Sequence, residues 1–257
     1  MYDISFIAPS IRVNLWKQLY ESIVNSFSGS WEIIFVGPYD NLKSLQFANN
    51  VRCISDWGSI TRCAQIGFLV SCGKWISIIP DDATFFPNEM DKVFLNIKNV
   101  DYTTFVLGKY LEGDINGVEM RNNEYFTLGY HDIFKRVTQW LPKSYYITAS
   151  GPISNKLVKE IGGLDCRFET TALGCVDLSV RLQNYNSNVM IHKDPLYHLT
   201  HFPCREGDHA PVHYAMLYND VPLFNYLYGS SECLNRKKID INNWQNSPKV
   251  WNRRFEL

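Results

Sequence analysis

The chain has 257 residues, of which 46% are hydrophobic and 20% are charged, and its formal net charge is −1. This composition is typical of a globular domain and argues against a disordered chain or a general nucleic-acid binder. The seven cysteines are scattered and form no C-x-x-C pair, so neither a disulfide framework nor a zinc knuckle is supported. No signal peptide and no run of about 18 apolar residues is found, so we expect a cytoplasmic protein without an integral membrane segment.

The first 80 residues alternate between apolar runs and amphipathic segments. The apolar runs, which predict buried strands, cover residues 4–8, 31–36, 51–54 and 75–79. Apolar residues at helical spacing predict helices at residues 15–27 and 60–71. Strands that alternate with helices predict an α/β fold, with a mostly parallel sheet that helices cover on both faces. Such sheets bind ligands at the carboxyl ends of their strands.

The pattern after residue 80 is less regular. Helices are predicted at residues 87–97, 153–161, 177–185, 212–218 and 221–228. Strands are predicted at residues 102–110, 145–150, 189–192 and 196–201, with a hairpin at 113–127. We therefore expect a nucleotide-binding half (residues 1–100), an acceptor and catalytic half with a smaller antiparallel sheet (101–203), and a C-terminal lid or helical extension (204–257).

Two adjacent carboxylates, Asp81 and Asp82, directly follow the predicted strand 75–79. Adjacent carboxylates repel each other, and a divalent cation such as Mg²⁺ or Mn²⁺ relieves the repulsion while it bridges to phosphate oxygens. Such a cation also neutralises charge on a leaving diphosphate. The alternative is a solvated Asp-Asp turn, or a helix cap ahead of Pro87.

Several segments, in this order and spacing, resemble those of GT-A fold glycosyltransferases, and of family 2 in particular. Residues 4–9 and 31–36 resemble the first two strands of that family, and residues 72–83 (CGKWISIIPDDA) resemble its D-x-D-type strand and the turn before it. Its later motifs are similar to residues 162–168 (GGLDCRF), 175–182 (CVDLSVRL) and 197–203 (YHLTHFP). The resemblance implies a Rossmann-like GT-A fold. It also implies inverting transfer of a sugar from a nucleotide-diphosphate donor, most simply a UDP-sugar, to a carbohydrate, lipid or protein acceptor.

The resemblance also implies a metal site. Asp82 would bind Mn²⁺ or Mg²⁺, and Asp81 would contact the ribose or share the metal. His198 or His201 would complete the site, because neutral imidazole is a good ligand for Mn²⁺-like ions. The alternative for either histidine is a half-buried strand residue that bonds to the backbone.

The expected donor site departs from the family at the end of the second strand. The family usually has an Asp-Asp pair there, one member of which reads uracil, whereas this chain has Gly37-Pro38. Backbone groups, Asp40 or Asp56 would then read the base, and Trp57 could stack on it. Arg62, near a helix N-terminus, suits phosphate, although a solvated helix arginine is the alternative. The residues expected to contact the donor are Pro9, Ser10, Arg12, Asp40, Asp56, Trp57, Arg62, Asp81 and Arg205.

The catalytic base also departs from the family pattern. The Glu-Asp pair of the family's "E-D-x-D-L" segment aligns with Gly174 and Cys175, and of its acids only Asp177 remains. An inverting transfer needs a carboxylate that takes the proton from the acceptor hydroxyl, and Asp177 or Glu169 could supply it. Asp177 could instead be a first-turn helix acid that pairs with Arg181, and Glu169 could be a surface-loop residue.

Two further segments could also belong to the site. The loop that contains Arg205, Glu206, Asp208 and His209 could order over a bound donor and exclude water. Aromatic residues at 125–130 and 145–146 could stack on an acceptor sugar or lie in the core.

A nucleotidyltransferase is disfavoured because the loop after the first strand lacks glycine, and a dinucleotide-binding fold is disfavoured because no G-x-G-x-x-G follows a strand. A non-catalytic nucleotide-sugar-binding relative stays open, as does a homodimer.

Overall fold

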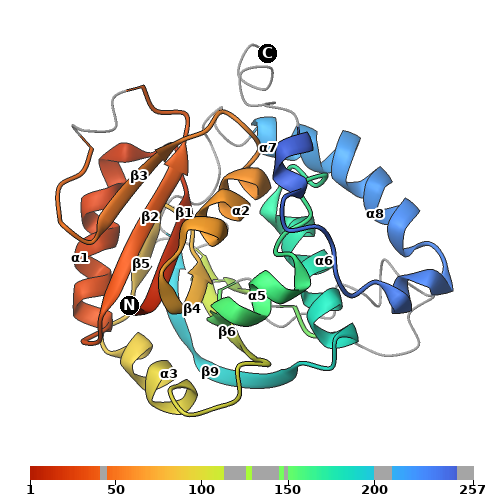
Figure 1. Cartoon of the computed structure of the whole chain (residues 1–257). Coiled ribbons are helices and arrows are strands. Elements are labelled where there is room, and N and C mark those ends of the chain that lie inside the picture. Colours follow the sequence, from red (N-terminus) through yellow and green to blue (C-terminus); the bar gives the residue numbers. More distant parts are fainter. Residues whose placement is uncertain (41–44, 113–125, 129–144, 148–149, 200–209, 248–257) are drawn as a thin grey trace.

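The computed structural model describes residues 1–40, 45–112, 126–128, 145–147, 150–199 and 210–247 (Figure 1). One nine-stranded sheet joins strands from both predicted halves of the chain, in the order β3-β2-β1-β4-β8-β6-β9-β5, with β7 paired to β6. Its strands are β1 (Tyr2–Pro9), β2 (Trp31–Gly37), β3 (Val51–Ser55), β4 (Gly73–Ile78), β5 (Ala83–Phe85), β6 (Thr104–Glu112), β7 (Phe126–Leu128), β8 (Ile153–Ser154) and β9 (Asn188–Leu199). The predicted α/β class is confirmed, and the antiparallel strands continue the same sheet.

Helices cover this sheet on both faces, and the C-terminal helix α8 packs on α6. The helices are α1 (Trp16–Ser26), α2 (Ile60–Val70), α3 (Glu89–Ile97), α5 (Asn155–Ile161), α6 (Thr171–Asn184), α7 (Ala210–Ala215) and α8 (Val221–Tyr228). A π-helical turn, η5 (Met216–Asp220), joins α7 to α8, and short 3-10 turns cover Val13–Leu15, Ser231–Asn235 and Asn243–Asn246. None of the helices in the described ranges has the length and apolar character needed to cross a membrane.

The parallel part of the sheet has a core on each side. β1 pairs in parallel with β2 and β4, and β2 pairs in parallel with β3. Side chains alternate along β1, so Phe6 packs on the α1 side and Ile7 on the α2 side. Figure 1 shows α1 on one side of these strands and α2, α5 and α6 on the other. This arrangement brings the carboxyl ends of four parallel strands to one edge.

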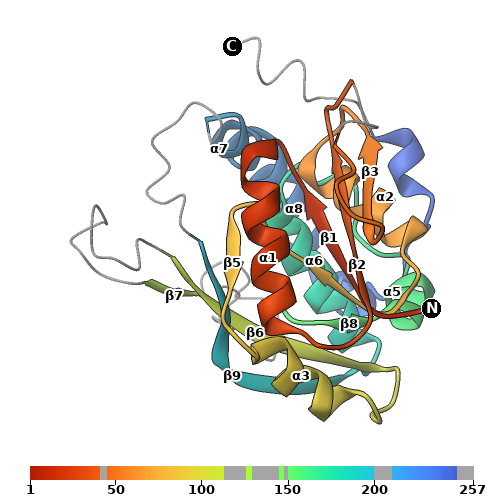
Figure 2. The same cartoon turned by 90° about the vertical axis from the view of Figure 1, so that its left-hand side faces the viewer.

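The second half of the sheet differs from its sequence-based prediction. β9 is one strand rather than two, with Pro195 beside a register shift opposite β6. Figure 2 shows β6 and β9 side by side below the parallel strands. β5, which was not predicted, starts directly after Asp82 and pairs antiparallel with β9. Residues 145–147 of the predicted strand 145–150 are irregular, and most of the predicted hairpin 113–127 lies outside the described residues.

Two helices begin at other residues than the sequence pattern predicts. α3 begins at Glu89 rather than at residue 87, because Asn88 has a left-handed conformation with φ 61°. α6 begins at Thr171 rather than at Asp177, and the two residues before it, Glu169 and Thr170, are held by the carboxylate of a residue far along the chain, Asp220. A sequence pattern cannot reveal a contact with a distant segment.

Candidate functional site

The carboxyl ends of β1, β2 and β3 are tied together by hydrogen bonds. The Tyr39 hydroxyl, just after β2, donates to the Ser10 carbonyl, just after β1. The Asp56 N–H, just after β3, donates to the Gly37 carbonyl at 2.9 Å. These contacts hold the segments that follow the strands at one edge of the sheet, where ligands of such folds bind.

The Asp81 carboxylate, just after β4, holds the loop that follows β1. Its Oδ2 accepts hydrogen bonds from the Ser10 hydroxyl at 2.7 Å, the Ile11 N–H at 2.9 Å and the Arg12 N–H at 2.8 Å. Its Oδ1 lies 2.5 Å from Arg12 Nη1. The Ser10 hydroxyl also accepts a bond from Trp16 Nε1. Asp81 is 3% exposed and its Oδ2 is saturated, so this geometry favours a loop anchor over an open metal ligand.

Asp82 and His198 suit a divalent cation better. Both are buried, and the β5–β9 register places His198 opposite Thr84, two residues from Asp82. A carboxylate oxygen and an imidazole nitrogen together form a donor set that Mn²⁺ accepts. The Nη1 atom of Arg12 lies 3.9 Å from Asp82 Oδ1, which adds positive charge beside this position. His201, the other predicted histidine ligand, lies outside the described residues, as does Arg205.

A second group of potential metal ligands lies elsewhere. The ligand atoms of Glu89, His192 and Asp194 lie within 4.8 Å of one another. His192 precedes His198 by six residues in β9, about 20 Å at ~3.3 Å per residue, so this group is remote from the edge that carries Asp82. The Lys92 ammonium pairs with Glu89 at 2.5 Å.

The structure leaves little room for a side chain at Gly37, at the end of β2, where the family that the sequence resembles has an Asp-Asp pair. A Cβ atom there would lie 2.0 Å from the Ser10 carbonyl oxygen and 2.6 Å from the Tyr39 hydroxyl. The space that an aspartate side chain would need is therefore filled by the loop after β1 and by the tyrosine. Burial raises the pKa of Tyr39 above its ordinary value, which keeps the hydroxyl protonated as a donor. Asp40, predicted to read the base, is exposed.

Asp56 and Arg62 form a buried pair. Arg62 Nε and Nη2 donate to the two Asp56 carboxylate oxygens at 2.9 and 3.0 Å. The third nitrogen, Nη1, donates to the carbonyls of Trp244 and Ser247, and the guanidinium lies 5.0 Å from the Trp244 ring centroid. The pair therefore links the start of α2 to the C-terminal segment. Donor contacts from Asp56, Arg62 and the half-buried Trp57 stay predictions.

Asp177 lies in the interior. It has no exposed surface, its Oδ2 accepts from Arg181 Nε at 2.7 Å, and its Oδ1 accepts from the Tyr228 hydroxyl at 2.6 Å and Arg236 Nε at 2.7 Å. Burial raises the pKa of Tyr228 well above its ordinary value, and the Asp177 charge adds to the effect. These surroundings favour a structural role, and the catalytic role drawn from the resemblance stays a prediction.

Glu169 lies at the start of α6 and is 8% exposed. This end of α6 packs on the start of α2, since a Cβ atom on Gly174 would lie 3.1 Å from Thr61 Oγ1. α2 itself starts just after the carboxyl end of β3, so Glu169 belongs to the same side of the molecule as Asp56. Its N–H donates to Asp220 at 2.8 Å. The sequence pattern does not predict a role for Asp220, which is an aspartate between the predicted helices 212–218 and 221–228.

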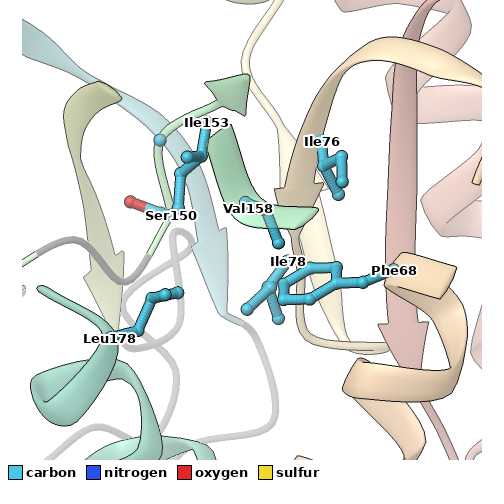
Figure 3. Close-up of a pocket in the computed structure, with 8 residues that line it drawn as sticks. Phe68, Ile76, Ile78, Ser150, Ile153, Val158 and Leu178 are labelled. Carbon is cyan, nitrogen blue, oxygen red and sulfur yellow. The ribbon is translucent and has the colours of Figure 1, made fainter. Parts of the chain in front are cut away.

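A small internal cavity is not the donor site. It measures about 10 Å³ and lies between β4, α2, α5 and α6, with Phe68, Ile78, Val158 and Leu178 among its walls. Figure 3 shows the Phe68 ring beside Ile78, with the Ser150 hydroxyl directed away from both. A cavity of this size holds at most one water molecule. It is a packing gap of the core.

The fold is α/β and GT-A-like. No family model matches the sequence, and no curated protein matches it. Among solved structures, S. aureus TarS, a GT-A-type glycosyltransferase, is similar over 85% of this chain and 40% of its own, at 13% identity and a TM-score of 0.56. The structure of S. aureus TarS 1–349 in complex with UDP is similar over 90% of this chain and 73% of its own, at 12% identity and a TM-score of 0.52. This chain thus spans about 40% of the longer TarS chain.

Proposed function

We propose that this protein is a glycosyltransferase that binds a nucleoside diphosphate sugar, a UDP-sugar in the first place, at the carboxyl ends of β1 to β4. The observation that carries the proposal is the loop from Ser10 to Arg12, which is fastened to Asp81 directly beside the buried Asp82. A GT-A-type fold supports it, as does the UDP bound in one structure of TarS. A pre-formed loop that carries an arginine suits a diphosphate.

Asp82 and His198 would hold a divalent cation, Mn²⁺ or Mg²⁺, with His201 as a further predicted ligand. When bound, the cation would supply positive charge that offsets the charge of the leaving diphosphate. The Arg12 guanidinium would lie beside the oxygens of the diphosphate, because its Nη1 lies 3.9 Å from Asp82 Oδ1. Asp81 would act by keeping the loop from Ser10 to Arg12 in place.

Glu169 would act as the catalytic base. It would take the proton of the acceptor hydroxyl while the acceptor oxygen bonds to the anomeric carbon and the bond to the diphosphate breaks, which inverts the configuration. Asp177 suits this step less well, since it is fully buried and bonded to two arginines and a tyrosine. The acceptor class (carbohydrate, lipid or protein), a homodimer and the division at residues 100 and 203 stay predictions.

The proposal is tested by the thermal unfolding of the purified protein with UDP, GDP, CDP or dTDP, in Mn²⁺ or in EDTA. A nucleotide at 100 times its dissociation constant stabilises by about 2.7 kcal/mol. We expect UDP to stabilise the protein only with Mn²⁺, and Asp82→Ala to abolish that stabilisation. The matched control is Asp194→Ala, which removes a carboxylate from the remote Glu89–His192–Asp194 group. If no nucleotide raises the unfolding temperature, or if Asp194→Ala rather than Asp82→Ala removes the Mn²⁺ effect, the proposed site is wrong.

A further inference from the structure

We infer that Asp220, in the π-helical turn η5, is a positioning residue for Glu169, so that the C-terminal segment completes the catalytic site. Asp220 has no exposed surface. Its Oδ1 accepts from the Glu169 N–H at 2.8 Å, and its Oδ2 accepts from the Thr170 N–H at 2.8 Å and the Thr170 hydroxyl at 2.6 Å. The inference rests on the proposed function, in which Glu169 takes a proton from the acceptor.

The chemistry of this contact is unusual for a buried carboxylate. Asp220 makes no ion pair with any described residue, and its hydrogen-bond partners there donate only neutral N–H and O–H groups, including Asn219 Nδ2 at 2.9 Å. Burying a charge without a cation is costly, so such a group persists where the bonds it makes are needed. Those bonds converge on the backbone of two consecutive residues, one of which is Glu169.

The π-helical turn explains how the carboxylate reaches this backbone. Turns of this kind are rare and occur frequently at functional sites. Here two consecutive side chains, Asn219 and Asp220, face the segment before α6, since Asn219 Nδ2 also donates to the Arg167 carbonyl at 3.0 Å. The preceding residues of the turn, Leu217 and Tyr218, are exposed. The turn therefore holds the chain from residue 167 to residue 170.

Asp220 also holds the N-cap residue of α6. Thr170 is the N-cap residue of this 14-residue helix, but its side chain makes no capping bond within the helix and donates to Asp220 instead. A carboxylate at a helix N-terminus satisfies unpaired N–H groups and is favoured by the helix dipole. Because the N–H groups of residues 169 and 170 both bond to Asp220, the backbone that carries the Glu169 side chain is restrained.

Asp220 is not needed to attach the C-terminal helix. α8 is already joined to α6 by the bond from Tyr228 to Asp177, and Phe224 of α8 packs against Phe168 in the segment before α6. A variant at position 220 should therefore retain the fold and lose the local order of residues 169–170. Misplacement of a catalytic group by about 1 Å can lower a rate by about 100-fold.

The test compares Asp220→Asn and Thr170→Val with Thr170→Ser, which keeps the hydroxyl donor. The activity is release of UDP from whichever of UDP-glucose, UDP-galactose or UDP-N-acetylglucosamine the wild-type chain hydrolyses fastest. We expect Asp220→Asn to lower kcat by about 10- to 100-fold, with KM for the donor and the UDP-induced thermal shift unchanged. Thr170→Val should lower kcat less, and Thr170→Ser should retain it. In a Glu169→Gln background, Asp220→Asn should cause no further loss.

Hydrogen exchange of the same full-length variants gives a second measurement that does not depend on activity. Asp220→Asn should speed exchange of the Glu169 and Thr170 amides, whereas the amides in the last turn of α6, which contains Arg181, should exchange as in the wild type. The inference is overturned if these amides exchange as in the wild type, or if kcat is unchanged in an active protein. It is also overturned if the loss persists in the Glu169→Gln background. Absence of any UDP binding by the wild type would refute the proposed function instead.

Discussion

Asp81 and Asp177 are both buried aspartates in segments that resemble family motifs, yet they organise different regions. Asp81 lies at the carboxyl edge of the sheet and is bound by two N–H groups, a serine hydroxyl and Arg12, whose side chain is 18% exposed. Asp177 lies inside α6 and is bound by Arg181 of the same helix and by Tyr228 and Arg236 from the C-terminal segment. Backbone donors shape a loop at an open edge, whereas charged side-chain donors hold helices together in the interior.

The largest effect should come from breaking the interior network. Asp177→Asn removes the charge that faces Arg181, which has no exposed surface, and Arg236. Loss of one partner of a buried ion pair lowers the free energy of unfolding by about 3–5 kcal/mol, because the remaining charge stays buried. Urea denaturation measures this change.

The control for this variant is Asp240→Asn, since Asp240 is exposed and bonds only to local groups through its side chain. It should leave the urea midpoint almost unchanged. If Asp177→Asn also left the midpoint unchanged but abolished hydrolysis of the donor, Asp177 would be the base and the comparison with Asp81 would fail.

A smaller effect should come from crowding the edge. In Gly37→Ala, the new methyl group meets the Ser10 carbonyl at 2.0 Å, so the loop after β1 must shift. Overpacking of this kind costs about 1–3 kcal/mol. Unlike Asp177→Asn, this variant should also weaken the UDP-induced thermal shift, because the loop belongs to the proposed donor site. Gly174→Ala, at the less crowded contact of 3.1 Å, is the matched control and should cost less.

The parallel half of the fold could be predicted because its signals are local. Apolar runs such as residues 31–36 form strands wherever both faces are covered, and the structure has β2 there. The position of Asp81 and Asp82 at a strand end followed from the same pattern. The second half could not be predicted equally well, because β5 and the start of α6 depend on partners that are distant in sequence, β9 and Asp220.

The candidate site was predictable only as a set of residue types. Ser10, Arg12, Asp81 and Asp82 were expected near one another, and the structure places them together. The sequence does not show that the Asp81 carboxylate accepts hydrogen bonds from the loop after β1, nor that Asp177 faces arginines from two segments. Hydrogen-bond partners depend on tertiary contacts, whereas motif spacing reports only which carboxylates follow a strand or lie on a helix.

The smallest effect should come from Tyr39→Phe, which removes one hydrogen bond to the Ser10 carbonyl and keeps the edge-on packing of the ring against Trp16. We expect a loss of about 1 kcal/mol at neutral pH. The variant also has a signature in alkali. Because burial raises the pKa of Tyr39 above its ordinary value of 10.0, the unfolded chain releases this proton first, so the wild-type protein loses stability as the pH rises above 10.0.

As the pH rises, the free energy of unfolding of Tyr39→Phe should therefore fall less steeply than that of the wild type. Urea denaturation between about pH 8 and about pH 11 measures this difference. It should not abolish the fall, because burial also raises the pKa of Tyr197 and Tyr228. Tyr228→Phe is the counterpart in the interior network, where the lost hydroxyl donates to Asp177. If Tyr39→Phe weakened UDP binding and Tyr228→Phe did not, the division between an edge that binds the ligand and an interior that holds the helices would be sharpened to a single hydroxyl in each region.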